Sequence, residues 1–196
     1  NYAYFNSPVL EFFIHRLISR TEFQTAILSG FGAYPPHAAK AMMNLLGSHD
    51  TQRVMTLAKR EATRVKQAVF FQMTSIGTPH IYYGDEIGMG DNIWLEDRMG
   101  VRTPMQWNGE PNAGFSAADP ADLYSPVIDD EVYGYRRINV EAQRADPGSL
   151  WHRMRHMIAV RKEQSILGYG DVHFLDAADT AHPGSTNPGV LAILRR

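Results

Sequence analysis

The chain has 196 residues and a formal net charge of −2, which is near balance and therefore gives no indication of nucleic acid or an acidic membrane surface as a partner. Hydrophobic residues make up 44% of it, yet no apolar run approaches the roughly 20 residues that a membrane span needs. The absence of cysteine excludes disulfides and thiolate metal sites, although it does not settle the compartment.

No targeting signal opens the chain. Its first residue is Asn1 instead of a methionine, and no basic stretch followed by an apolar stretch comes after it. We expect these residues to be a fragment of a longer, cytoplasmic protein.

Two helices are predicted at the start of the chain. Val9, Phe13 and Leu17 are spaced as residues on one helical face. A second, short helix follows, with Ser19 or Thr21 as its N-cap and a glycine-rich exit.

Strands and helices then alternate. The apolar run at 41–46 predicts a buried strand through about Leu46, and apolar periodicity predicts a helix over 63–75. Residues 81–83 are rich in strand-forming side chains and predict a second strand. This order, with short connections, is typical of parallel α/β units.

Residues 84–146 form a long segment that is rich in Gly, Pro, Asn and Asp and has no sustained periodicity. Connections of this length are uncommon unless they are functional or disordered. Six aromatic residues argue against disorder. We therefore expect an ordered functional loop held by its own apolar anchors, which are Trp94, Trp107, Phe115, Tyr124, Tyr133 and Tyr135.

The last part of the chain predicts one helix and two strands. Asp146 is a candidate cap, and Pro147 is a candidate first residue of a helix with a regular apolar face. Residues 171–179 and 189–196 predict two strands joined by a loop, and residues 166–170 mark the expected start of a second module.

Two of the predicted strands end in acidic clusters, His49-Asp50 and Asp85-Glu86. Catalytic groups of parallel α/β proteins lie at the carboxyl ends of the strands, where the loops converge. A carboxylate beside an imidazole suits sugar chemistry, because its oxocarbenium-like transition state is flanked by carboxylates. Aspartate is also a common N-cap, so His49 and Asp50 could instead cap the next helix. The spacing alone leaves both interpretations open.

Three motifs follow one another along the chain: NLLGSHDTQR, then FFQMTSIGTPHIYYGDEIGM, then DRMGVRTPMQWNGEPNAGFS. Together they resemble the α-amylase superfamily, glycoside hydrolase family 13. The resemblance implies an α/β fold that is the C-terminal part of a (β/α)8 TIM barrel, about strands 6 to 8, followed by the start of an antiparallel β-domain. Residues 1–165 would form the partial barrel, with the long loop at about 84–146, and residues 166–196 would begin the β-domain.

The resemblance also implies roles for single residues. Asp50 matches the catalytic carboxylate that binds sugar hydroxyls and stabilises the transition state, and His49 matches a histidine that hydrogen-bonds the same sugar. Arg102 matches an arginine near the sugar-binding subsites. Asp85 and Glu86 could contact the sugar directly as a carboxylate pair, but the resemblance favours a structural role for them at the floor of the site.

Two other groups of residues have weaker signals. Trp94, Trp107 and Phe115 could stack on sugar rings, but buried aromatics that anchor a loop are the commoner arrangement. The histidines other than His49 share no metal-ligand spacing. We expect no metal and no cofactor in this chain, and the resemblance leaves open a calcium ion in a full-length parent.

A retaining glycosidase also needs a carboxylate nucleophile and a carboxylic acid as general acid/base. In the resembling family these come from the fourth and fifth strands, and neither pattern precedes Asp50. We therefore expect these groups in a missing N-terminal part of the barrel, which would be a partner of this chain, and we expect the chain by itself to be inactive.

The subfamily resemblance is divided. After about residue 85 the chain resembles trehalose synthases, and before it the neopullulanases and cyclomaltodextrinases. The expectation is a fragment of a retaining hydrolase or transglucosidase of trehalose synthase type, with maltose or an α-glucan oligosaccharide as ligand and no nucleic-acid or membrane partner. A neopullulanase or α-glucosidase-type hydrolase and a noncatalytic amylase-like scaffold are the alternatives.

Overall fold

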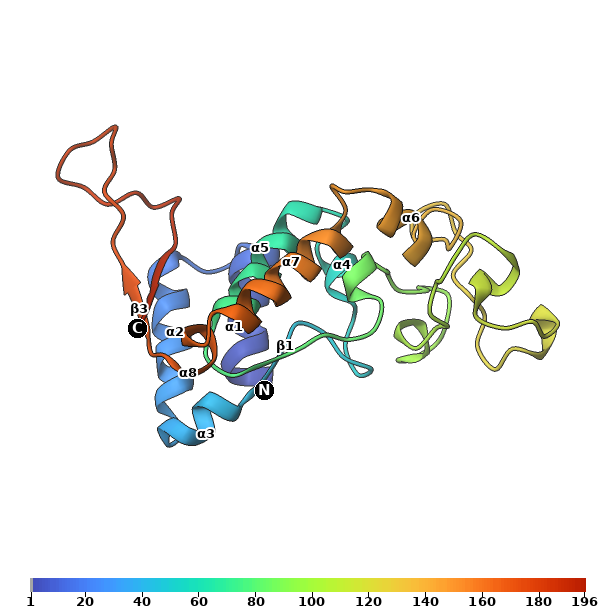
Figure 1. Ribbon diagram of the computed structural model, residues 1–196, viewed down its shortest axis with the longest axis horizontal. Helices are drawn as coiled ribbons and strands as arrows, with labels where there is room; N and C mark the ends of the chain where they lie inside the picture. The colour runs from blue at the N-terminus through green and yellow to red at the C-terminus, as the bar shows by residue number, and fades with distance from the viewer. Residues whose placement is uncertain (1) are drawn as a thin grey trace.

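The computed structural model describes residues 2–196, and the expectation drawn from Asn1 lies outside them. A helical body occupies the middle of an elongated molecule, with a β-hairpin at one end and the long segment 84–146 at the other (Figure 1). In this described part of the chain, no helix is long and apolar enough to cross a membrane.

The chain starts with a helical segment in three parts, η1 (Tyr2–Asn6), α1 (Ser7–Val9) and η2 (Leu10–His15). It ends at Arg16, whose φ of 56° lies in the left-handed region that commonly terminates helices. Leu17 follows this reversal and is 74% exposed. The predicted helical face is therefore correct for the buried Val9 but wrong for Leu17.

Helix α2 (Arg20–Gly32) begins at Ser19, one of the two predicted caps. The Ser19 hydroxyl accepts a hydrogen bond from the backbone N–H of Glu22, and the Glu22 carboxylate accepts one from the Ser19 N–H at 2.8 Å. This reciprocal pair is a capping box. Helix α3 (Pro36–Ala41) follows, and its six residues are too few to show an apolar period.

Strands β1 (Met43–Leu45) and β2 (Thr78–His80) pair in parallel, with Met43 opposite Thr78 and Leu45 opposite His80. The parallel pairing is as predicted, and β1 lies in the predicted apolar run. The predicted position of the second strand, 81–83, is wrong by three residues. Because the pairing with β1 ends at Leu45, those residues have no strand beside them in the described chain.

Buried amide side chains hold the strand carbonyls. Gln72 donates from Nε2 to the carbonyls of Asn44 and His80, both at 2.9 Å. Asn6 donates from Nδ2 to the carbonyls of Leu45 and Leu46 at 3.2 and 3.0 Å. These bonds satisfy backbone groups that a neighbouring strand would otherwise pair.

The strands do not close a barrel. Within residues 2–196, β1 and β2 are the only parallel pair. Residues 2–42 are helical or irregular, so the sixth barrel strand expected at the start of the chain is not found among the described residues. The observed fold is an open α/β arrangement.

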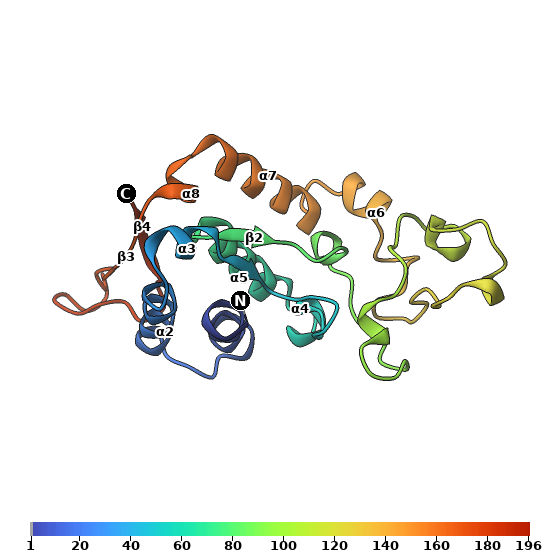
Figure 2. The ribbon, with the colours of Figure 1, turned by 90° about the horizontal axis from the view of Figure 1, so that it is seen from below.

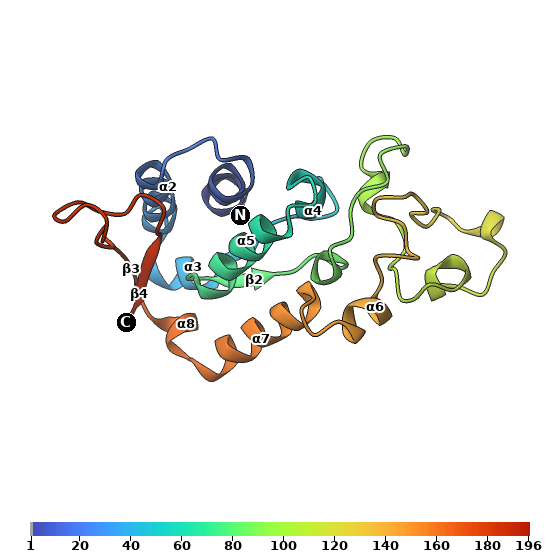
Figure 3. The ribbon, with the colours of Figure 1, turned by 90° about the horizontal axis from the view of Figure 1, so that it is seen from above.

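Helices α4 (Val54–Leu57) and α5 (Ala62–Thr74) connect the two strands, and α5 agrees with the helix predicted over 63–75. Helix α5 packs against η2 on one side and α7 (Leu150–Glu163) on the other (Figures 2 and 3). The core between these helices includes the buried side chains of Phe5, Phe23, Ile27, Val65, Phe71 and Met154.

The long segment contains five short helical turns, η3 (Asp85–Ile87), η4 (Met99–Val101), η5 (Pro111–Gly114), η6 (Pro120–Asp122) and α6 (Val140–Ala145). Backbone hydrogen bonds close it on itself, from the N–H of Val140 to the carbonyl of Gln106 and from Tyr135 to Ile128. The buried Gln106 side chain also donates to the Tyr133 carbonyl at 3.1 Å. The segment is ordered, as the sequence predicts.

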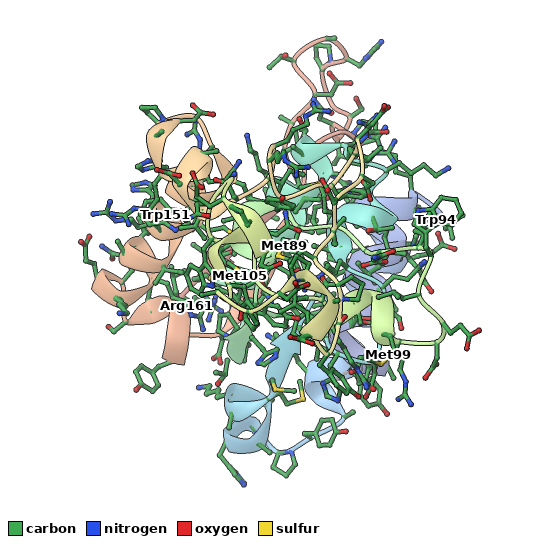
Figure 4. The ribbon with its side chains drawn as sticks, turned by 90° about the vertical axis from the view of Figure 1, so that its right-hand side faces the viewer. Met89, Trp94, Met99, Met105, Trp151 and Arg161 are labelled. Atoms are coloured by element: carbon green, nitrogen blue, oxygen red, sulfur yellow. The ribbon has the colours of Figure 1, made fainter. Side chains whose placement is uncertain are left out.

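Its aromatic anchors are fewer than predicted. Tyr133 and Tyr135 are buried, but the four others are exposed: Trp94, Trp107, Phe115 and Tyr124. Trp94 is 81% exposed and lies at the periphery of the molecule in Figure 4. The prediction of buried anchors is wrong for these four residues, because internal hydrogen bonds such as those of Gln106 order the segment in their place.

Helix α7 begins three residues later than predicted. Ser149 is its cap and accepts a hydrogen bond from the backbone N–H of His152. Asp146 instead ends α6, and its carboxylate accepts a hydrogen bond from the Gly148 N–H at 2.8 Å. Asp146 and Pro147 therefore belong to a turn between α6 and α7 that the Asp146 side chain stabilises. The prediction that they start α7 is wrong.

A hairpin follows α8 (Ile166–Tyr169). Its strands, β3 (Val172–Leu175) and β4 (Ala192–Arg195), are antiparallel and lie within the predicted ranges 171–179 and 189–196. Two arginines tie the hairpin to the helical body. Arg195 donates to the carbonyl of Thr74 at the end of α5, and Arg20 of α2 donates to the carbonyl of Asn187 at 3.0 Å.

Candidate functional site

A tight turn follows β1 and carries the motif Ser48-His49-Asp50. The Ser48 N–H donates to the Thr51 hydroxyl, and the Asp50 N–H donates to the Ser48 hydroxyl, both at 3.0 Å. The next helix, α4, has Arg53 as its N-cap, with no side-chain cap bond. Asp50 and His49 therefore cap no helix, and the turn presents both side chains at the carboxyl end of the strand.

The structure brings the three predicted site residues together. Oδ1 of Asp50 accepts hydrogen bonds from Arg98 at 2.7 Å and from Arg102 at 3.1 Å. Arg102 also donates from Nε to the His49 carbonyl at 2.8 Å, and His49 Nε2 lies 3.4 Å from Oδ2 of Asp50. The Asp50 side chain is 39% exposed and that of His49 is 64% exposed, so the cluster is accessible to a ligand.

Arg98 is the member that the sequence prediction missed. It lies four residues before Arg102, on the other side of the short turn η4. Its guanidinium also bonds the Asp97 carboxylate at 3.2 Å, and this pairing raises the pKa of Arg98 and lowers the pKa of Asp97. Two arginines four residues apart around a turn are the signal that could have indicated it.

A pocket of about 520 Å³ opens beside this cluster. Arg102 belongs to both, and Glu86 is the other charged residue of the pocket wall. Four exposed aromatic residues line it: Tyr83, Trp107, Phe115 and Tyr124. Aromatic faces with a few charged groups suit a ligand that has both apolar faces and hydroxyl groups.

Asp85 and Glu86 occupy different environments. Asp85 is buried and lies 3.7 Å from the Arg53 guanidinium, and burial raises the pKa of its carboxyl to about 7 despite the arginine. Glu86 is partly exposed, and its carboxylate accepts a hydrogen bond from the Gly84 N–H at 2.8 Å. Asp85 therefore lies in the protein interior, whereas Glu86 lines the pocket.

No group of three or more His, Asp or Glu side chains in the part of the chain that the structure describes could hold a metal ion. The side chains gathered at this turn are one carboxylate, one imidazole and two guanidinium groups. These groups can accept and donate hydrogen bonds to hydroxyls and can stabilise charge.

Comparison with known protein families finds a match over most of the chain. Residues 17–170 match the family described as the alpha-amylase catalytic domain. This range includes the turn after β1, the pocket and the whole of the long segment.

Named relatives of the chain include two groups of enzymes. It is 44% identical over 144 residues to a trehalose synthase of Pimelobacter sp. (strain R48), across 74% of this chain and 24% of that protein. It is 43% identical over 145 residues to a trehalose synthase/amylase of Mycobacterium tuberculosis, across 74% and 23%. A cyclomaltodextrinase of Bacillus sp. is 41% identical over 108 residues, across 55% and 18%. The chain spans about a quarter of the length of these relatives or less.

Solved structures show the same architecture. A cyclomaltodextrinase superposes with a TM-score of 0.63 at 27% identity, over 100% of this chain and 26% of that one. An isomaltulose synthase mutant of Erwinia rhapontici NX5, in complex with its natural substrate sucrose, gives a TM-score of 0.67 at 20% identity, over 91% and 36%. At that identity the likeness shows the fold alone. The open α/β arrangement thus corresponds to about a third or less of the length of these two chains.

Proposed function

The chain belongs to the alpha-amylase catalytic-domain family, and on this ground we propose that it carries the sugar-contacting part of a retaining α-glucosyl site of trehalose synthase type. The observation that carries the proposal is the convergence of His49, Asp50 and Arg102 at the carboxyl end of β1, beside the aromatic pocket. In this proposal β1 and β2 are the seventh and eighth strands of the barrel. Residues 166–196 begin a separate β-domain.

The chemistry of the cluster fits the proposed roles. In a retaining glycosidase the transition state carries positive charge on the sugar ring, which a nearby carboxylate stabilises. Asp50 would supply that carboxylate and accept hydrogen bonds from sugar hydroxyls. His49 and Arg102 would donate to the same sugar and fix its orientation, which lowers the entropic cost of reaching a reactive geometry.

The arginines occupy one oxygen of the Asp50 carboxylate and leave the other open to a sugar. Oδ1 already accepts from Arg98 and Arg102, whereas Oδ2 faces only the His49 ring at 3.4 Å. We therefore expect sugar hydroxyls to approach Oδ2 first. The arginine bonds to Oδ1 would hold the carboxylate in place while the sugar binds.

Asp50 alone cannot carry out a double displacement, since this needs a nucleophile and a general acid/base as well. We propose that both come from the part of the barrel outside these 196 residues. The chain by itself would then bind maltose without turning it over. Incubation of the purified chain with maltose and with an aryl α-glucoside tests this directly, and turnover above the buffer rate would refute it.

Sugar binding can be followed at the tryptophans. The chain has three, of which Trp107 lines the pocket and Trp151 lies on α7. We expect maltose to shift the NMR signal of the Trp107 indole N–H and to leave that of Trp151 unchanged. Asp50→Asn should weaken this binding about tenfold, as expected for loss of a hydrogen bond to a charged group. Asp176→Asn is the matched control, since Asp176 is also paired with an arginine but lies on the hairpin at the other end of the molecule.

A hydrolase is the second candidate, because the cyclomaltodextrinase relatives match nearly as closely over a shorter region. A noncatalytic scaffold is the third. A longer protein that contains this chain distinguishes them by its products from maltose: trehalose for the synthase, glucose for the hydrolase and neither for the scaffold.

A further inference from the structure

Arg53 lies three residues after Asp50 and does not reach the pocket. Its side chain is fully buried, the largest such side chain in the described part of the protein. Burying a guanidinium is costly unless its hydrogen bonds are replaced by protein partners. The groups that Arg53 contacts come from both sides of the candidate site.

The guanidinium holds the segment that leads to Arg102. It donates to the Val101 carbonyl at 3.2 Å and to the Tyr83 carbonyl at 2.6 Å. Its centre lies 4.8 Å from the ring centres of both Tyr82 and Tyr83, and the Tyr82 hydroxyl donates to the same Val101 carbonyl at 3.1 Å. The backbone just before Arg102 is therefore fixed by two donors.

The backbone of Arg53 holds the other side of the site. Its N–H donates to Asp91 Oδ1 at 3.0 Å, and the Asp91 N–H donates to the Thr56 hydroxyl at 2.9 Å. These bonds fasten the end of the turn that carries Asp50 to the start of the long segment. One residue thus connects the Asp50 turn with the Arg102 segment, 48 positions further along the chain.

The charges around Arg53 do not explain its burial as a stabilising ion pair. Its guanidinium pairs with the Asp85 carboxylate only at 3.7 Å, and among residues 2–196 neither Oδ1 of Asp85 nor Nε of Arg53 has a hydrogen-bond partner. A buried pair with such geometry contributes little net stability. The well-formed bonds of Arg53 are those to the Tyr83 and Val101 carbonyls.

We propose that Arg53 is a positioning residue that sets the placement of the Arg102 guanidinium relative to the Asp50 carboxylate. The relevance of this placement to sugar binding rests on the function proposed above, but the placement itself does not. Arg53→Lys keeps the charge, but it replaces the planar guanidinium with a compact ammonium group. This group cannot lie between the two tyrosine rings and donate to the Tyr83 and Val101 carbonyls at the same time. The segment before Arg102 then loses one of its two donors.

The test follows the Arg102 Nε–H, which donates to the His49 carbonyl, by its rate of exchange with solvent in NMR. Arg102→Lys identifies the signal. Arg53→Lys should speed this exchange about tenfold, because the Arg102 bond to the turn is no longer held. Arg161→Lys is the matched control: Arg161 is partly buried and, like Arg53, donates to backbone carbonyls, those of Met73, Ser75 and Gly77. It lies on α7, on the opposite side of the view in Figure 4 from Met99, which belongs to the turn between Arg98 and Arg102. This variant should leave the exchange unchanged.

An unchanged Arg102 exchange rate in a folded Arg53→Lys variant would overturn the proposal and leave Arg53 a purely structural residue. An equal acceleration in Arg161→Lys would overturn it as well. If Arg53→Lys does not fold, Tyr82→Phe removes the other donor to the Val101 carbonyl and should accelerate the exchange in the same direction. No effect of Tyr82→Phe would then count against the proposal.

Maltose titration separates the two proposals. If the unmodified chain shows no maltose response at Trp107 but Arg53→Lys accelerates Arg102 exchange, the proposed function fails and the positioning role stands. If maltose binds and both Arg102 exchange and maltose affinity are insensitive to Arg53→Lys, the positioning role fails alone.

Discussion

The buried carboxyl of Asp85 makes the stability of this protein depend on pH. Desolvation is the largest cause of its raised pKa, and the charges of Glu86 and Asp91 act in the same direction. The Arg53 guanidinium opposes them, but at 3.7 Å without a hydrogen bond it does not offset them. The folded-state pKa is about 7, against the ordinary aspartate value of 3.8.

The sign follows from proton binding. Between these two pKa values the folded state holds a proton on Asp85 that the unfolded state has released, so the free energy of unfolding falls as the pH rises through this window. Above pH ~7 the contribution is constant at its least favourable value. A gap of about three pH units corresponds to at most about 4 kcal/mol, of which about 3 kcal/mol lies between pH ~5 and ~8.

Asp85→Asn removes this titration while keeping the size of the side chain. The stability of the variant relative to the unmodified chain should therefore rise by up to about 3 kcal/mol between pH ~5 and ~8. Urea unfolding followed by tryptophan fluorescence at several pH values in this range measures the difference. The comparison with the unmodified chain at each pH cancels the titration of all other groups.

The exposed Asp97 is the control: its hydrogen bond from the Arg98 guanidinium lowers the pKa of its carboxyl, so Asp97→Asn should give a stability difference that does not vary with pH over the same range. A constant difference for Asp85→Asn as well would refute the reasoning. It would mean that Asp85 is ionised in the folded state, and hence that Arg53 or solvent compensates its charge.

Three further predictions concern stability. Ser19→Ala breaks the capping box with Glu22 and should lower the free energy of unfolding by about 0.5–2 kcal/mol, whereas Ser19→Asp should retain most of it, as measured by urea unfolding. Phe23→Ala leaves a cavity in the aromatic core and should cost about 3–5 kcal/mol, with Phe115→Ala at the surface as the comparison for the same assay. Gly84→Ala should lower the thermal unfolding midpoint, because Gly84 has a φ of 88° and a Cβ there would lie 2.5 Å from Met89 Sδ; an unchanged midpoint would show that η3 can shift to accept it.

The sequence alone was sufficient for features that depend on nearby residues. Ser19 is one of the two predicted caps, and the helix over 63–75 is predicted because thirteen residues show a clear period. The family was recognised because its motifs are contiguous runs. The three candidate site residues came from those runs, and the structure places them in contact.

Features that depend on contacts between distant parts of the chain were not predictable. The three-residue offset of β2 arose because the pairing of a strand is decided by its neighbour, and β1 ends after Leu45. The exposed position of Trp107 arose because Gln106, a polar residue, took the interior of the segment. Aromatic content predicts order but does not tell which side chains face the core.

The sequence by itself determined the family of this protein, its parallel α/β character and the residue types at the end of β1, because these depend on local spacing and composition. Only the tertiary structure decided that Arg98 and Arg102 meet Asp50, and that Arg53 joins the two segments from inside. Those contacts span about fifty residues of chain with no regular period. They exist only once loop closure has brought the segments together, and the charged side chain of Arg53 in particular is buried only where carbonyl partners are in place.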